Sequence, residues 1–146
     1  MKVVLQRVDS ARVVVDEEIT GQIGKGLLLF VCFEQGDHRE ILPRAVERIS
    51  KLRCFSDAEG KMNLNISQIQ GEILSVSQFT LSWEGTGGHR PSFEGSLHPG
   101  EARLMWAEFN KLLRALDLPV QEGRFGAEMK VELVNDGPVT FHLQFP

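Results

Sequence analysis

The sequence has few residues of the kinds that crosslink a chain or bind metal ions. It contains two cysteines, Cys32 and Cys54, and four histidines, at positions 38, 89, 98 and 142. Neither cysteine lies in the loop framework of a disulfide-rich secreted domain, and no CxxC or HxxxH spacing typical of a metal site occurs. We therefore expect two buried, reduced thiols, no metal and no cofactor.

Long apolar runs are also absent. The longest, at residues 26–33, is far shorter than the roughly 20 residues that a membrane-spanning helix requires. Gln6 and Arg7 interrupt the apolar N-terminal stretch, so that stretch does not have the form of a secretory signal peptide. These features predict a cytoplasmic protein with no membrane partner.

A basic excess is missing as well. The chain has 16 Lys and Arg against 20 Asp and Glu, a formal net charge of −4. A protein that coats nucleic acid neutralises many phosphates and is normally basic, so the charge argues against that class and by itself favours a small-molecule enzyme. The chain of 146 residues, with 42% hydrophobic and 25% charged residues, is predicted to form one globular domain over residues 1–146.

Hydrophobic patterning predicts strands at the start of the chain. Two strands rich in β-branched residues, over 3–8 and 11–15, are expected to meet at a hinge near Asp9 and Ser10. The continuous apolar run over 27–33 is typical of a strand that is buried on both faces. We expect this run to be the central strand of a sheet.

Two helices are predicted from apolar residues at helical spacing. The first is expected to begin at Asp37, a suitable N-cap, and to end near Arg53. Pro43 lies inside this window, so either the regular helix begins there or its first turns are kinked. The second helix follows Pro99 and stops before Pro119.

The remaining segments predict more strands and one long loop. A strand is expected over 71–80, and a Gly- and Pro-rich loop over 81–100 is long enough to be functional. The end of the chain is interpreted as a strand over 129–134, a tight turn over 135–138 and a strand over 139–145. This order of elements indicates an α+β fold with the helices on one side of a sheet.

The segment 75–81 carries hydroxyl and amide side chains where a structural strand would carry apolar ones. One interpretation is a polar face at a sheet edge. The other is a strand end at which main-chain N–H groups and small hydroxyls converge on a ligand. Thr80 is the obvious nucleophile by residue type, but the segment offers no base; His89 in the following loop is the nearest candidate.

Three further features have both a structural and a functional interpretation. Residues 135–140 form either an ordinary turn or, through the Gly137-Pro138 bond, a rigid rim of carbonyl groups. Arg7 either extends from a sheet edge or holds backbone carbonyls with its planar guanidinium. Phe125 and Met129, on either side of Gly126, are either core residues or ligand contacts.

Taken together, the segments 77–81 (SQFTL) and 135–140 (NDGPVT) resemble the motif pair of the D-aminoacyl-tRNA deacylase family. The resemblance runs almost end to end. Its supporting segments lie at 6–8, 60–64, 90–93 and 123–127. The resemblance implies a single-domain α+β fold in a layered β/β/α arrangement, with a mixed sheet and two main helices.

The resemblance also implies a function. Members of the family are homodimeric hydrolases that cleave the ester between a D-amino acid and the 3′-terminal adenosine of tRNA, and similar proteins also remove glycine from mischarged tRNA. The implied partners are the aminoacylated 3′ end of tRNA and a second copy of the chain. Because only the end of the RNA is held, few phosphates need neutralising, which is consistent with the net charge of −4.

The resemblance assigns roles to individual residues. Gly137 and Pro138, joined by a cis peptide bond, would enter the pocket of the other subunit and exclude L-amino acids, and Arg7 would orient them. The implied catalytic and substrate-binding residues are Ser77, Gln78, Phe79 and Thr80 at the strand end, with Phe125 and Met129 lining the pocket. The family uses the terminal 2′-hydroxyl of the tRNA to assist water, so Thr80 would not attack the ester itself.

Two alternatives remain open from the residues. One is a module that binds an RNA 3′ end or a nucleotide without hydrolysing it. The other is a hydrolase of small esters with Thr80 as nucleophile.

Overall fold

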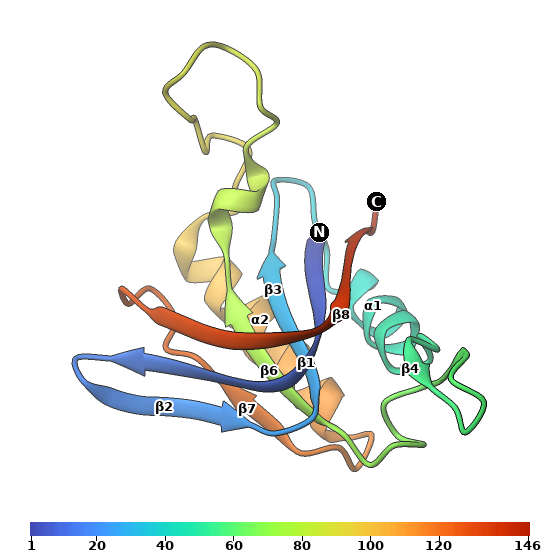
Figure 1. Cartoon of the computed structure of the whole chain (residues 1–146). Helices are drawn as coiled ribbons and strands as arrows, with labels where there is room; N and C mark the ends of the chain where they lie inside the picture. The colour runs from blue at the N-terminus through green and yellow to red at the C-terminus, as the bar shows by residue number, and fades with distance from the viewer.

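A six-stranded mixed sheet dominates the computed structural model, which describes all 146 residues (Figure 1). The strand order is β2-β1-β3-β6-β7, and β8 pairs with β1. The pairs β3-β6 and β6-β7 are parallel and the others are antiparallel. The strands are β1 (Lys2–Val15), β2 (Glu18–Ile23), β3 (Gly26–Cys32), β6 (Glu72–Ser77), β7 (Val120–Glu122) and β8 (Lys130–Gln144). With two helices, this mixed sheet confirms the predicted α+β class.

β1 is one long strand that changes partner in the middle. Its first part, from Lys2 to Val8, pairs with β3, and its second part, from Ala11 to Val15, pairs with β2. Figure 1 shows the bend in β1 between these two parts. The prediction of two separate strands was therefore wrong, because pairing with β8 continues across the expected hinge.

The bend brings β2 towards the far edge of the sheet, so the sheet nearly closes on itself. Gly21 on β2 approaches the backbone of β7 so closely that an added Cβ would lie 2.5 Å from the carbonyl oxygen of Glu122. Only glycine fits such a contact between two backbones. The result is a barrel-like sheet with an inner and an outer face.

Alternate residues of β3 supply both cores of the molecule. Leu27 and Leu29 belong to the larger core, between the outer face of the sheet and the helices, whereas Leu28 belongs to the smaller core inside the curved sheet. All three are fully buried. This confirms β3 as a strand buried on both faces, with β1 and β6 as its neighbours.

The two predicted helices are present, with corrected bounds. α1 spans Ile41–Ser50 and α2 spans Pro99–Arg114, and both cover the same face of the sheet (Figure 1). Glu40, not Asp37, occupies the N-cap position of α1, because the carboxylate of Asp37 is used by other partners. Pro43 lies in the first turn, where a missing N–H costs no helical hydrogen bond.

The tight turn predicted over 135–138 does not reverse the chain. β8 pairs antiparallel with β1 on both sides of it, from Thr140 opposite Gln6 to Asn135 opposite Val8. Residues 136–139 are therefore an outward bulge in one continuous strand, not the tip of a hairpin. The prediction of a tight turn was therefore wrong, because the strand segments on its two sides share the same partner.

The shorter elements complete the chain. β4 (Phe55–Ser56) pairs with β5 (Met62–Leu64). β6 ends at Ser77 and is followed, after Gln78, by the short 3-10 helix η1 (Phe79–Ser82). The exposed loop after η1 projects from the body in Figure 1.

Cys32 and Cys54 are buried and free, as predicted. None of the helices has the length and apolar character needed to cross a membrane.

Candidate active site

A cavity of about 530 Å³ lies where four segments distant in the sequence come together. They are the end of β3 with the turn after it, the end of β6 with η1, the loop leading into α2, and the segment before β8. Its lining is mainly apolar and contains no carboxylate, lysine or arginine. The lining residues are Val31, Cys32, Phe33, Gln35, Ser77, Gln78, Phe79, Phe93, Ser96, Leu97, His98, Pro99, Ala102, Phe125 and Gly126.

Three of the four predicted catalytic residues line this cavity. The N–H of Gln78 donates to the carbonyl of Val31 at 2.7 Å, which ties the end of β6 to β3 before the chain turns into η1. Phe79 is 57% exposed, and its ring contacts Phe93 edge to face with centroids 5.0 Å apart. Ser77, Gln78 and Phe79 therefore form one wall of the cavity.

Thr80 is exposed and is not part of the lining. The only hydrogen bond of its hydroxyl is accepted from Nε2 of Gln78 at 2.5 Å. Phe79 and Thr80 are the first two residues of η1, so their N–H groups have no partner within that turn. Main-chain donors at this end of the cavity are thus available to a ligand, whereas Thr80 has no neighbouring base.

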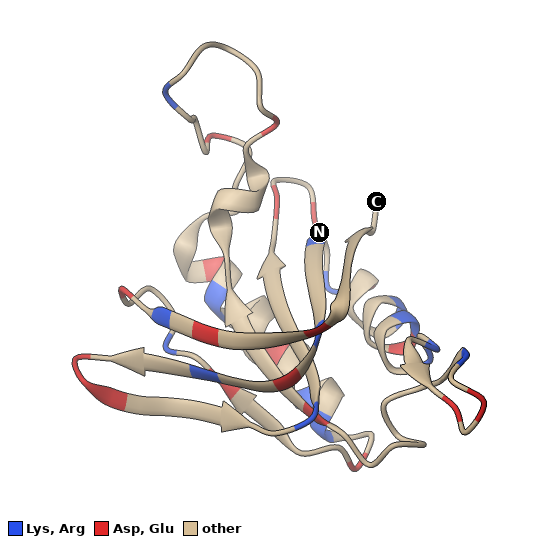
Figure 2. Ribbon diagram, in the orientation of Figure 1, with Lys and Arg blue, Asp and Glu red and all other residues tan.

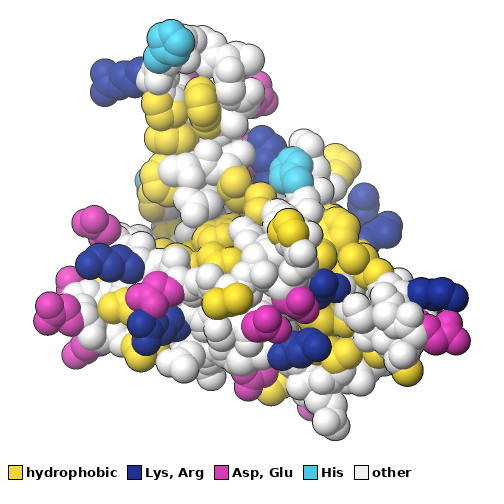
Figure 3. All heavy atoms as spheres, viewed as in Figure 1, with side chains coloured by type: hydrophobic (Ala, Val, Ile, Leu, Met, Phe, Trp, Pro, Cys, Tyr) yellow, Lys and Arg dark blue, Asp and Glu magenta, His cyan; other side chains and the backbone are white.

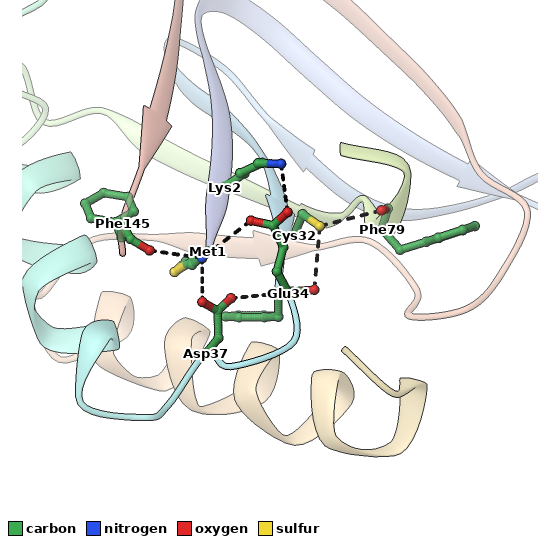
Figure 4. A network of polar contacts seen from close by, with 8 residues as sticks. Met1, Lys2, Cys32, Glu34, Asp37, Phe79 and Phe145 are labelled. Carbon is green, nitrogen blue, oxygen red and sulfur yellow. Dashed lines mark hydrogen bonds and ion pairs between the residues drawn. The ribbon is translucent and has the colours of Figure 1, made fainter. Parts of the chain in front are cut away.

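Cys32 is a lining residue that the sequence did not indicate as part of the site. Its thiol lies 3.5 Å from the carbonyl oxygen of Phe79, to which it donates (Figure 4). Burial, reinforced by the nearby carboxylate of Glu34, raises the pKa of Cys32 to about 11. The thiol is therefore protonated at neutral pH and does not provide a thiolate nucleophile.

The turn after β3 and the segment before α2 form a second wall. The N–H of Gln35 donates to Gly95 at 2.9 Å, and the N–H of Leu97 donates to Phe33 at 3.0 Å. The side chain of Gln35 adds a bond of 2.6 Å to the carbonyl of Glu94. These hydrogen bonds fix the loop leading into α2. The sequence predicted that the loop over 81–100 is functional but did not indicate which of its residues line a site.

A polar network joins the turn after β3 to the start of β1 (Figure 4). The carboxylate of Asp37 accepts from the Met1 ammonium at 2.6 Å and from the N–H of Glu34 at 2.7 Å. Glu34 in turn pairs with Lys2 at 2.7 Å, and the pKa of Lys2 is raised mainly by this bond. The start of β1 and the turn that bears Gln35 are thus held together.

Phe125 lines the cavity and Met129 does not. The ring of Phe125 contacts Trp106, with centroids 5.8 Å apart, and the guanidinium of Arg103 lies 5.3 Å from its centroid. Met129 instead packs beside the smaller core, with its sulfur 2.8 Å from where a Cβ on Gly123 would stand. The structure of one chain therefore separates two residues that were predicted to act together.

Gly137 and Pro138 lie on the exposed bulge of β8, and the peptide bond between them is cis. Neither residue lines the cavity of its own chain. Arg7 holds the bulge from the protein side: its Nε donates to the carbonyl of Asp136 at 2.8 Å and its Nη1 to the carbonyl of Cys54 at 2.6 Å. This matches the carbonyl-holding role expected for its guanidinium.

Solved structures with the same architecture were found. One described as "c-Myc DNA Unwinding Element Binding Protein" has a TM-score of 0.94 and 37% sequence identity, and covers 100% of this chain and 99% of its own. A second, described as a probable eukaryotic D-amino acid tRNA deacylase, has a TM-score of 0.83 at 18% identity over 97% of both chains. At that identity the second likeness shows the fold alone.

Sequence comparison defines the family. A D-aminoacyl-tRNA deacylase of Shewanella amazonensis is 51% identical over 144 residues, 99% of either chain. One of Saccharophagus degradans is 51% identical over 143 residues, 98% of this chain and 99% of its own. The model of the D-Tyr-tRNA(Tyr) deacylase family matches residues 4–144. The chain belongs to this family of hydrolases, which confirms the resemblance seen in its two motifs.

Proposed function

We propose that the protein hydrolyses the ester bond of D-aminoacyl-tRNA and releases the free D-amino acid and tRNA. The observation that carries this proposal is the cavity walled by residues 77–79, in a chain that belongs to the deacylase family. The cavity is large enough for an aminoacylated nucleoside, and its apolar lining with few polar groups is typical of small-molecule sites. The activity is expected in the cytoplasm.

Main-chain donors at η1 support a mechanism without a side-chain nucleophile. We place the ester carbonyl near the N–H groups of Phe79 and Thr80, which would stabilise the oxyanion formed when water attacks. The terminal 2′-hydroxyl of the substrate assists that water. Because the Thr80 hydroxyl contacts only the Gln78 amide, it has no base to activate it as a nucleophile.

Selection against L-amino acids is assigned to the bulge of β8. In this proposal, Gly137 and Pro138 of one subunit enter the cavity of a second subunit and occupy the space that an L side chain needs. Two observations support the role: both residues are exposed outside their own cavity, and Arg7 holds the adjoining carbonyl of Asp136. Glycine has no side chain to exclude, so glycyl-tRNA is a further proposed substrate. The active form is accordingly a homodimer.

The surface charge fits a protein that holds only the end of an RNA. Basic and acidic side chains are mixed over the elements of the fold, without a continuous basic stripe on the face shown (Figures 2 and 3). Binding along a duplex would require such a stripe and would depend steeply on salt. A substrate held by its 3′ terminus requires few phosphate contacts.

The proposal is tested with D-Tyr-tRNA and L-Tyr-tRNA, by following the release of labelled tyrosine. We expect release from the D-aminoacyl substrate and little from the L-aminoacyl one. Equal rates, or no release of D-tyrosine, would overturn the proposal. Binding of a non-hydrolysable D-aminoacyl adenosine without turnover would indicate a nucleotide-binding module instead.

A further inference from the structure

His98 combines two features at one edge of the cavity. It is the N-cap residue of α2, where its Nδ1 accepts a hydrogen bond from the N–H of Gly100 at 3.3 Å. It also lines the cavity together with Pro99 and Ala102 of the same helix. A structural role as a cap would explain the first feature but not the second.

The cap bond determines where the ring carries its proton. A ring nitrogen that accepts a hydrogen bond has no proton, so in the neutral ring the proton is on Nε2. The ring makes no hydrogen bond within the chain other than the one to Gly100. The Nε2–H is therefore a donor without a protein partner, on a ring whose orientation is set by the helix.

The other nitrogen and sulfur donors among the lining side chains each make one hydrogen bond within the chain, and each glutamine amide keeps a second N–H. The amide of Gln35 donates to the carbonyl of Glu94, the amide of Gln78 donates to Thr80, and the thiol of Cys32 donates to Phe79. No lysine or arginine lines the cavity. His98 differs from these side chains because its ring donates no hydrogen bond within the chain, so its single N–H is free for a ligand at this edge of the cavity.

We propose that His98 is a substrate-binding residue whose Nε2–H donates to an acceptor oxygen of the aminoacylated terminal nucleotide. The inference rests on the proposed function, because that substrate carries ribose, ester and phosphate oxygens and the cavity is otherwise mainly apolar. Fixing the ring through Nδ1 reduces the entropy lost when the bond to substrate forms. His98 then contributes to binding, and the hydrolytic step depends on the groups at η1.

The variant His98→Asn separates the two roles. Asparagine is among the best N-cap residues, so its side-chain oxygen keeps the bond to Gly100, while its own amide N–H groups sit on a side chain too short to reach the position of Nε2. We expect an unchanged melting temperature, a KM for D-Tyr-tRNA raised about fivefold to tenfold and a kcat close to that of the wild type. His98→Ala is expected to show the same rise in KM and, in addition, a lower melting temperature.

A binding measurement makes the test independent of turnover. The probe is 3′-(D-tyrosylamino)-3′-deoxyadenosine, a non-hydrolysable amide, titrated by calorimetry into wild type, His98→Asn and the control His38→Asn, whose residue does not line the cavity. We expect a Kd raised about fivefold to tenfold in His98→Asn alone. An unchanged Kd and KM in this variant, or no binding of the probe by the wild type, would overturn the inference. Failure of the wild type to release D-tyrosine would overturn only the proposed function.

Discussion

The Nε–H of Arg7 donates a 2.8 Å hydrogen bond to the main-chain carbonyl of Asp136, a residue 129 positions further along the chain. The same guanidinium reaches the carbonyl of Cys54 and lies 3.2 Å from the carboxylate of Asp136. Its side chain is only 9% exposed. One arginine thus joins β1, the approach to β4 and the bulge of β8, directly behind Gly137.

Replacing this arginine by lysine tests whether the planar guanidinium, which donates to two carbonyls at once, is required for stability and activity. Lysine has one ammonium group and cannot hold both carbonyls in the same directions, so Arg7→Lys leaves one buried acceptor unpaired. We expect the free energy of unfolding to fall by about 2 kcal/mol and D-aminoacyl-tRNA hydrolysis to fall by at least about tenfold. The matched control is Arg12→Lys, an exposed arginine paired with Glu132, which should change stability by less than about 1 kcal/mol. Equal effects in the two variants would contradict the role of Arg7.

Gly137→Ala introduces a methyl group at the tip of the bulge. The φ of Gly137 is +149°, and an added Cβ would lie 2.7 Å from the backbone nitrogen of Val139. Because the bulge is exposed, we expect it to shift while the rest of the fold stays intact. The rate on D-Tyr-tRNA should fall by about 10²-fold, since small displacements in a site cost that much.

The control for this variant is Gly60→Ala. Gly60 also has a positive φ, of +77°, but an added Cβ meets nothing within 4 Å. Alanine at this positive φ lowers stability, but Gly60 does not line the cavity, so both activity and D/L selectivity should be unchanged. Normal rate and selectivity in Gly137→Ala, with a native circular dichroism spectrum, would count against the selection role of the bulge.

Thr80→Ala distinguishes hydrolysis at main-chain donors from attack by a side chain. Removing the hydroxyl leaves the N–H groups of η1 in place, so the rate on D-Tyr-tRNA should fall by less than about tenfold. Loss of a true nucleophile costs on the order of 10⁴-fold or more. Single-turnover kinetics with excess enzyme measure this step directly. Complete loss of hydrolysis in a folded variant would favour the esterase with Thr80 as nucleophile.

Cys32 is expected to make stability depend on alkaline pH. Its pKa is about 11 in the folded protein against an ordinary value of 9.0, so between these values the unfolded chain loses the thiol proton first. The free energy of unfolding is therefore complete below about pH 9 and falls as the pH rises towards about 11. Urea titrations at about pH 8 and about pH 10.5 measure the difference.

Cys32→Ser removes the ionising group and should weaken this pH dependence. Burial also raises the pKa of Cys54, so part of the dependence is expected to persist in the variant. The same slope in wild type and variant would show that the Cys32 thiol ionises equally in the folded and unfolded chains.

Local patterns in the sequence determined most of the elements and the family. The apolar run at β3, the helical spacing of α1 and α2 and the two motifs each depend on residues that are close in the chain. Their side-chain periods are set by local geometry, so they can be recognised without knowing what packs against them.

Only the tertiary structure decided which of these segments meet. β8 continues through residues 135–138 because both of its halves pair with β1, and that pairing is between opposite ends of the chain. Cys32 and His98 belong to the cavity, and Met129 does not, because four distant segments converge there. Such contacts depend on how strands and helices pack in space, and the periodicity of a local segment of sequence carries no information about them.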